Sequence, residues 1–370
     1  MILNGDKFGY YKSNNTITYS KYEAFENGNP EWIFNDDIFS AFDWTKEPET
    51  PIWEMYKDRV RQIRDQYDYC VLWYSGGSDS HNILNAWLET GCKIDEIATT
   101  WNYNTTGEKQ NHQNAEITNV VLPDIDNLQK KGYNFKFRLI NIPDYGLKTF
   151  NKLTTNLEYY FNYNLQLSSL GKQFLRDEIE DYKNIINSGK KLCFIWGKEK
   201  PYIFYENGKY CFRFVDSVDD CVGPYTQQRF NQGWYDELFY WSPDYPLLPI
   251  KMAHTIKNFL KISEDKNKFH DYSYQAYDIG YSAGYSAKLN MHLKQETQKT
   301  LLYPKWSNSI FCNGKSIFRI LGLRDNWFVN STSDELIKIK NVITNYRNVS
   351  SEKLNRKAIY PLYSKTYWLE

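Results

Sequence analysis

Residues 69–90 place a short apolar run, a glycine-rich loop and a helix-type segment in immediate succession, and this order limits the fold more than any other feature. Tyr69–Tyr74 (YCVLWY) is continuously apolar, as a strand buried on both faces of a parallel sheet requires. Ser75–Ser80 (SGGSDS) forms the loop, and His81–Thr90 (HNILNAWLET) has helical spacing with Gly91 as its C-terminal cap. The segment therefore predicts one strand–loop–helix unit of an α/β sheet.

The sequence around this unit repeats the alternation. Strands that alternate with helices favour a parallel twisted sheet with helices on both faces and right-handed crossovers. We expect further strands at 94–100, 135–142 and 192–196, and helices at 52–67, at 109–131 (interrupted or ended near Pro123) and at 166–187.

The two ends of the chain have different patterns. Residues 7–24 predict a β-hairpin around the turn residues 12–15. After about residue 225 prolines punctuate the chain, and helix-like segments follow at 250–261 and 334–347. The expected parts are an N-terminal hairpin and helix (1–64), a central α/β domain (65–225) and a mostly helical C-terminal region (226–370).

Charge and aromatic content bear on the class of partner. Lys plus Arg and Asp plus Glu both number 45, so the chain lacks the bulk positive charge of most proteins held on nucleic acid, although a local basic patch stays open. Aromatic residues make up 18% of the chain. Codon bias of an AT-rich viral or bacterial genome is one explanation, and an aromatic-lined substrate groove is the other.

The cysteines and the apolar pattern bear on the compartment. None of the 6 cysteines forms a Cys-x-x-Cys pair, so zinc-ribbon and iron–sulfur spacings are missing, and several cysteines lie in apolar runs as small buried hydrophobes. The N-terminus lacks the pattern of a signal peptide, and no apolar run reaches the length of a membrane span. We therefore expect a reduced, cytoplasmic protein without a membrane partner, in a bacterial or phage-infected cell.

The loop is suited to binding phosphates. Gly76 and Gly77 have no Cβ, so the backbone can bend tightly and come close to an anion. The amides of Gly76, Gly77 and Ser78, together with the positive end of the following helix, would then face phosphate oxygens. The hydroxyls of Ser75 and Ser80 can donate further hydrogen bonds.

Asp79 suggests a metal ion. A carboxylate beside phosphates repels them unless a cation lies between, so we expect Asp79 to hold Mg²⁺.

The pattern Ser-Gly-Gly-x-Asp-Ser resembles the loop of the PP-loop, or N-type ATP pyrophosphatase, superfamily, and matches all of its fixed positions. No Gly-Lys-Ser/Thr follows, so it is not a Walker loop. The resemblance covers about residues 65–225 and is nearest in style to asparagine synthetase-like and 7-cyano-7-deazaguanine synthase-like proteins. It implies an adenine-nucleotide α-hydrolase-like fold, with ATP cleaved between its α and β phosphates and pyrophosphate held in the loop.

The resemblance also implies roles outside the loop. It points to Thr99, Thr100 and Trp101 for adenine binding, although Trp101 suits a protein core equally well. A second phosphate-facing loop would be Gly197–Pro201, in which Lys198 neutralises phosphate charge as the α–β bond breaks. A solvated lysine in a turn is the alternative.

Three other features stay open between function and packing. Asp216, with Asp219 and Asp220, is expected to complete the Mg²⁺ site or hold a substrate amine, unless these acids are simply solvated. Arg138 either faces the nucleotide or has a structural partner. The segment Glu237–His254 either covers the acceptor substrate or packs the core against the C-terminal region.

Several branches of the superfamily are disfavoured. Residue 2 is Ile rather than the nucleophilic Cys of glutamine-dependent asparagine synthetases, and the upstream segment is too short for a glutaminase domain. The four-cysteine zinc site of the cyano-deazaguanine synthases is missing, and zero net charge does not favour an RNA-binding lysidine synthetase.

What remains is an AMP- and pyrophosphate-forming ligase or amidotransferase-like enzyme. It would use Mg-ATP to adenylate a small-molecule acceptor before attack by an amine or ammonia. A nucleic-acid base-modifying enzyme with the same chemistry, encoded by a phage, stays open as an alternative but is not favoured. A non-catalytic nucleotide-binding module and a homodimer also stay open.

Overall fold

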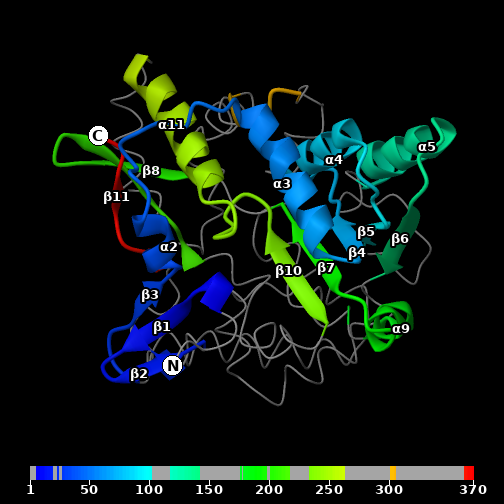
Figure 1. The fold of residues 1–370 in the computed structure, drawn as a ribbon, viewed down its shortest axis with the longest axis horizontal. Coiled ribbons are helices and arrows are strands. Elements are labelled where there is room, and N and C mark those ends of the chain that lie inside the picture. Colours follow the sequence, from blue (N-terminus) through cyan, green and yellow to red (C-terminus); the bar gives the residue numbers. More distant parts are fainter. Residues whose placement is uncertain are drawn as a thin grey trace, which may run out of the picture.

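A five-stranded, fully parallel sheet forms the centre of the molecule, and its strand order is β10-β7-β4-β5-β6 (Figure 1). The computed structural model describes residues 6–19, 23–24, 27–101, 117–141, 176, 178–197, 201–216, 233–262, 301–305 and 362–370. The strands are β4 (Tyr69–Trp73), β5 (Glu96–Trp101), β6 (Lys136–Asn141), β7 (Leu192–Trp196) and β10 (Trp234–Leu238).

The strand order creates a reversal next to β4. The chain builds outward from β4 to β5 and β6, then returns to the other side of β4 for β7 and continues to β10. In open α/β sheets, ligands bind outside the carboxyl ends of the strands at such a switch point. The strands expected from the sequence are thus parallel neighbours in one sheet. The loop after β4 lies at the carboxyl edge of this sheet, where a ligand is expected.

Helices cover both faces of this sheet, as predicted. Successive side chains of a strand point to opposite faces. On β10, Glu237 pairs with Arg59 of α3 (Ile52–Gln66), whereas Asp236 pairs with Arg176 on the other face. The Arg176 guanidinium lies over the Phe194 ring, which Tyr182 of α9 (Glu180–Asn187) also contacts.

The helix boundaries agree with the sequence only in part. The helix after the loop, α4 (Ser78–Thr90), packs beside α3, begins three residues before the predicted His81 and ends at Gly91, whose φ of 68° is left-handed. A π-helical turn, η3 (Ile117–Val121), runs directly into α5 (Leu122–Lys130), so the chain stays helical past Pro123 and the expected interruption or end at this residue is wrong. Only the hydrogen-bond pattern changes, from π to α, next to Pro123.

The N-terminal hairpin is confirmed and has a third strand. After η1 (Asp6–Phe8), β1 (Tyr10–Ser13) pairs antiparallel with β2 (Thr16–Thr18). Asn14 in the turn between them has a positive φ of 51°. The sequence did not predict β3 (Glu31–Ile33), which pairs with the other edge of β1. The short helix α2 (Asp36–Ser40) follows.

A second antiparallel sheet, which the sequence analysis missed, joins β8 (Tyr202–Glu206), β9 (Lys209–Arg213) and β11 (Tyr367–Trp368). The β8–β9 turn is Asn207-Gly208, and both residues have positive φ, at 52° and 79°. This dipeptide is the strongest short-range hairpin signal, so the hairpin was readable from the sequence.

The parallel sheet continues to Leu238 and therefore crosses the boundary expected near residue 225. The strand β10 (WYDEL) was missed because two of its residues, Asp236 and Glu237, are acidic and nevertheless buried in ion pairs. The helix predicted at 250–261 is present as α11 (Leu247–Ile262). The helix predicted at 334–347 lies outside the described residues.

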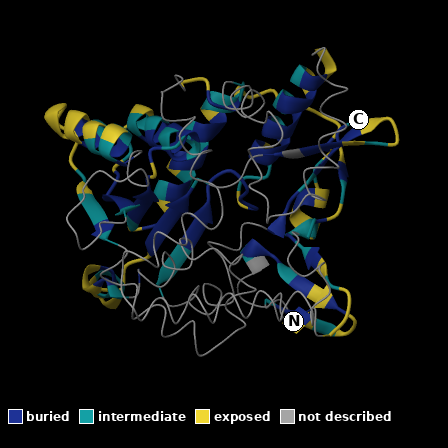
Figure 2. Ribbon diagram, turned by 180° about the vertical axis from the view of Figure 1, so that it is seen from behind, coloured by how far each residue is buried: buried dark blue, intermediate teal, exposed yellow. Residues whose placement is uncertain are grey.

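Much of the aromatic content serves packing. Six of the 12 tryptophans are buried within the described part of the chain. The Trp44 ring stacks on Tyr367 of β11 and Phe212 of β9, at centroid distances of 4.4 and 5.0 Å. Figure 2 shows the strands of the central sheet largely in dark blue, with exposed residues on the outer helices. The stacked rings belong to the core, which also joins the two ends of the chain.

The cysteines behave as expected where they are described. Cys70 and Cys193 lie side by side in the central sheet with no exposed surface, and burial raises the pKa of the Cys70 thiol to about 12. Cys221 and Cys312 lie outside the described residues. None of the described helices has the length and apolar character needed to cross a bilayer.

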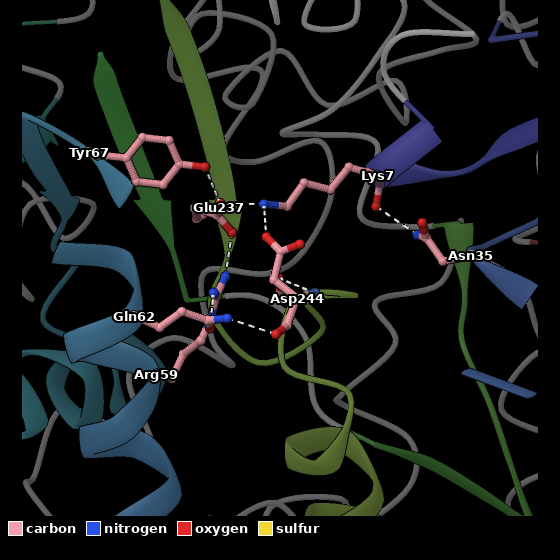
Figure 3. Close-up of polar contacts among 8 residues, drawn as sticks. Lys7, Asn35, Arg59, Gln62, Tyr67, Glu237 and Asp244 are labelled. Carbon is pink, nitrogen blue, oxygen red and sulfur yellow. Dashed lines mark hydrogen bonds and ion pairs between the residues drawn. The ribbon is translucent and has the colours of Figure 1, made fainter. Parts of the chain in front are cut away.

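A buried carboxylate ties the N-terminal segment to the sheet (Figure 3). Glu237 accepts hydrogen bonds from Arg59, Tyr67 and Lys7. The Lys7 ammonium also lies 2.6 Å from Asp244 Oδ2. Burial alone would raise the pKa of the Glu237 carboxyl, but the charges of Arg59 and Lys7 outweigh it and hold the pKa below the ordinary 4.5.

Glu237→Gln should lower the free energy of unfolding by about 3–5 kcal/mol, because it leaves Arg59 as a buried charge without its partner. Glu206→Gln is the matched control, since Glu206 pairs with Arg213 at a partly exposed site and should cost no more than about 1 kcal/mol. Urea unfolding measures both. Equal losses in the two variants would contradict a special role for Glu237.

The same network predicts a pH dependence. Because the folded pKa of Glu237 is lowered, its stabilising contribution is present above pH 4.5 and is lost as the pH falls through the folded pKa. The stability gap between wild type and Glu237→Gln should stay constant above about pH 5.5 and then narrow by up to about 1.4 kcal/mol per pH unit on acidification. Urea unfolding between pH 7 and pH 3 measures the gap, and an unchanged gap at pH 3 would show that the prediction is wrong.

Candidate functional site

The glycine-rich loop leaves the central strand at the switch point of the sheet. Tyr74 N–H still donates to Ala98 O of β5, at 2.9 Å, and the chain then turns away from the sheet. Gly76 has a φ of 74°, a left-handed conformation that costs a residue with a Cβ about 1–2 kcal/mol. Gly77 is the N-cap residue, and α4 begins at Ser78. The predicted loop thus opens a helix as the sequence indicated.

Two of the three serines of the loop, Ser75 and Ser80, brace its backbone. Ser75 N–H donates to Ser80 Oγ at 3.2 Å, and the Ser80 hydroxyl donates to Gly77 O at 3.1 Å. The two hydroxyls are 3.3 Å apart. Ser80 is buried and Ser75 is exposed, so we assign Ser80 mainly to shaping the loop and Ser75 to its outer surface.

Gly197, directly after β7, approaches the loop closely. A Cβ built on Gly197 would lie 3.1 Å from Ser80 N and 3.2 Å from the Asp79 carbonyl carbon, both of them backbone atoms. The end of β7 therefore lies against the first turn of α4. This contact fits the expectation that the segment after β7 belongs to the same site, although Lys198, Lys200, Asp219 and Asp220 lie outside the described residues.

Tyrosines hold Asp79 at two points. Tyr303 donates a hydrogen bond to Asp79 Oδ1, and Tyr240 donates to the Asp79 carbonyl oxygen at 2.8 Å. Both tyrosines are buried. The sequence gave no signal for these contacts, because Tyr240 and Tyr303 are separated from Asp79 by 161 and 224 positions.

A polar cluster lies on the other side of the loop. The buried Tyr74 hydroxyl donates to Asp124 on α5 and lies 2.9 Å from His81 Nδ1 on α4. Burial would raise the pKa of the Asp124 carboxyl, but the hydrogen bonds with His81 and Tyr74 outweigh it and hold the pKa below 3.8. The cluster fixes α5 to the strand and helix that flank the loop.

The residues expected at the adenine have different surroundings. Thr99 is buried, and its hydroxyl donates to Tyr74 O at 2.7 Å, so it supports the residue before the loop. Thr100 and Trp101 are half-buried at the carboxyl end of β5, and Trp101 packs against the hydrophobic core. A role of Thr100 and Trp101 in adenine binding stays a prediction.

Asp216 has structural partners. Its Oδ2 accepts from the Tyr11 hydroxyl at 3.1 Å, and its Oδ1 accepts from Leu362 N–H at 2.8 Å. These bonds lead to the N-terminal sheet and the C-terminal segment. Asp216 thus has a structural role, and its role as a metal ligand stays a prediction.

Arg138 and the segment Glu237–His254 both have packing roles in the described residues, and their functional alternatives stay predictions. Arg138 pairs with the buried Glu96 at 2.6 Å and with Asp181 at 2.7 Å. Within Glu237–His254, β10 and α11 contribute mostly buried residues to the core.

The loop offers donors suited to a magnesium–polyphosphate. Backbone amides, hydroxyls and one carboxylate meet at the start of α4, and Mg²⁺ commonly takes one or two protein carboxylates together with phosphate oxygens and water. In the described part of the chain, no group of three or more His, Cys, Asp or Glu side chains could hold a metal on its own. The role of Asp79 as a Mg²⁺ ligand stays a prediction.

Comparisons with known proteins do not identify the chain. No model of a known protein family matches it, and no curated protein matches it.

Gly197→Ala should lower the free energy of unfolding by about 1–3 kcal/mol, since the added methyl meets backbone atoms of Asp79 and Ser80. It should also speed hydrogen exchange of His81 N–H, which bonds Gly77 O at 2.9 Å in the first turn of α4.

Gly91→Ala is the control, because Gly91 is left-handed but has open space around its Cβ position. It should destabilise the protein without the local effect at His81. Unfolding and exchange measurements follow both variants, and wild-type exchange in Gly197→Ala would contradict the close contact.

Proposed function

We propose that the chain is an ATP-dependent ligase of the N-type ATP pyrophosphatase class, which forms AMP and pyrophosphate. One observation carries the proposal. The Ser-Gly-Gly-Ser-Asp-Ser loop follows the central parallel strand at the switch point of the sheet, and its last residues form the first turn of α4, where backbone amides lie at the helix N-terminus. Loop geometry of this kind binds phosphates because helix N-termini present unpaired N–H groups and a positive dipole end.

The fold agrees with this proposal at a coarser level. Five parallel strands with helices on both faces, and a reversal beside β4, support an adenine-nucleotide α-hydrolase-like domain. In our proposal, the amides of Gly76, Gly77 and Ser78 bind the β and γ phosphates. Ser75 adds a hydroxyl from the exposed side of the loop, and Ser80 keeps the loop in shape.

Charge must be neutralised as pyrophosphate leaves. Asp79 would hold Mg²⁺, which supplies positive charge to the phosphates. Lys198 follows Gly197 in the sequence, and the contact of Gly197 with the loop supports a place for this lysine near the phosphates. Both groups would act on charge that develops on the departing pyrophosphate.

The reaction has two steps in this proposal. A substrate oxygen attacks the α phosphorus of ATP, the α–β bond breaks, and the acceptor becomes adenylated as pyrophosphate is released. An amine or ammonia then attacks the activated carbon and displaces AMP, and the amine loses a proton. No side chain forms a covalent intermediate, so catalysis depends on position and charge.

A small-molecule acceptor is favoured over nucleic acid. Net charge is zero, and the described tryptophans are largely used in the core rather than on a surface for base stacking. Thr100 and Trp101 remain the proposed adenine contacts.

Purified protein with Mg-ATP and candidate carboxylate, amide or nucleobase acceptors plus ammonia should release AMP and pyrophosphate in equal amounts. Asp79→Ala should lower this rate by at least about 100-fold, because it removes the carboxylate beside the phosphates. Excess EDTA should abolish release.

Asp126→Asn is the control, since Asp126 lies on the exposed face of α5 and pairs with Lys130 in a surface contact. It should keep the wild-type rate. Release of ADP and phosphate by the wild type would refute the proposed bond cleavage. Nucleotide binding without pyrophosphate release for any acceptor, nucleic acid included, would favour a non-catalytic module.

A further inference from the structure

Residues 301–305, far from the loop in the sequence, lie across α3 and α4. Tyr56 of α3 donates a hydrogen bond to Leu302 O at 2.8 Å. The Lys305 ammonium pairs with Glu89 at the end of α4, at 2.6 Å, and lies 4.9 Å from the centroid of the Trp53 ring. These contacts fix the segment on both sides of Tyr303.

From this segment, Tyr303 contacts the loop Ser75–Ser80. Its hydroxyl donates to Asp79 Oδ1, and its ring lies 5.8 Å from Tyr240, which in turn packs against Tyr56 at 5.7 Å. The Tyr303 phenol is therefore placed as a hydrogen-bond donor to the Asp79 carboxylate.

Asp79 is thus held through both its main chain and its side chain. Tyr240 fixes the carbonyl, and Tyr303 fixes one carboxylate oxygen, which restricts the rotation of the side chain. Carboxylates that bind metals are commonly oriented by such neighbouring hydrogen bonds. Because the Asp79 side chain is already oriented, it loses less conformational entropy when the cation binds.

We propose that Tyr303 is a positioning residue that orients Asp79 for Mg²⁺, so that the segment 301–305 completes the nucleotide site. The inference rests on the proposed function and adds to it a specific part for the C-terminal region. Tyr303 does not touch the reacting atoms and acts only through Asp79.

The test measures binding rather than turnover. Calorimetry of the full chain with α,β-methylene-ATP, which resists α–β cleavage, is carried out at a series of Mg²⁺ concentrations and in EDTA. In Tyr303→Phe, the Mg²⁺ concentration for half-maximal enhancement of binding should rise about 10–100-fold. The affinity in EDTA should stay within about twofold of wild type, because the amides of the loop are unchanged.

Tyr67→Phe is the matched control. It removes another buried phenol that donates to a carboxylate, Glu237, and should leave the Mg²⁺ dependence unchanged. A double-mutant cycle separates orientation from general loosening, since Tyr303→Phe should have no further effect in an Asp79→Asn background.

The outcomes are distinct. An unchanged or tighter Mg²⁺ dependence in Tyr303→Phe overturns the inference while the proposed function stands, and so does an equal loss in Tyr67→Phe or an additive loss in the double variant. A wild-type protein that binds no analogue with or without Mg²⁺ overturns the proposed function, and the inference falls with it.

Discussion

The close approach of two backbones at the end of the central strands is the constraint on which the candidate site depends. The loop after β4 must turn through a left-handed residue, and Gly76 allows this. The chain after β7 must then pass within van der Waals contact of the first turn of α4, and Gly197 leaves the space. Because both glycines lack a Cβ, the N-terminal amides of α4 and the end of β7 meet at one edge of the sheet.

A second constraint connects this edge to the rest of the molecule. Glu237 fixes β10 to α3 and to the N-terminal segment, and Tyr240 follows two residues after the end of β10. Phe239 N–H keeps this continuation next to β7 by donating to Trp196 O at 3.1 Å. Tyr240 then bonds the Asp79 carbonyl. Glu237, which anchors β10, and Tyr240, which bonds the loop, thus lie on one short stretch of chain.

The sequence predicts the parts of this architecture that depend on local patterns. The apolar runs of β4 and β7, the spacing of α3 and the cap at Gly91 are all properties of neighbouring residues, and the structure places these elements as expected. The strand β10 escapes prediction because its acidic residues are neutralised by Arg59 and Arg176, which lie far away in the sequence. Burial of charge depends on partners that a local pattern does not contain.

The candidate site divides in the same way. The loop itself is a local motif that its own residues predict. The hydrogen bond from Ser75 N–H to Ser80 Oγ, and the one from the Thr99 hydroxyl to Tyr74 O, appear only in the folded structure. Asp216 was chosen because it is acidic and close to other acids in the sequence. Its hydrogen bonds instead serve Tyr11 and Leu362, which belong to opposite ends of the chain.

The tyrosine content shows why composition alone was ambiguous. Tyr56, Tyr240 and Tyr303 are buried and their rings pack together in one cluster, which is the behaviour of core residues. Their hydroxyls nevertheless end on the main chain of Leu302 and on Asp79, because a buried phenol needs a hydrogen-bond partner. The same side chains therefore fill the space between α3, α4 and the C-terminal segment and determine how the loop aspartate is held, so packing and site geometry here have a single physical cause.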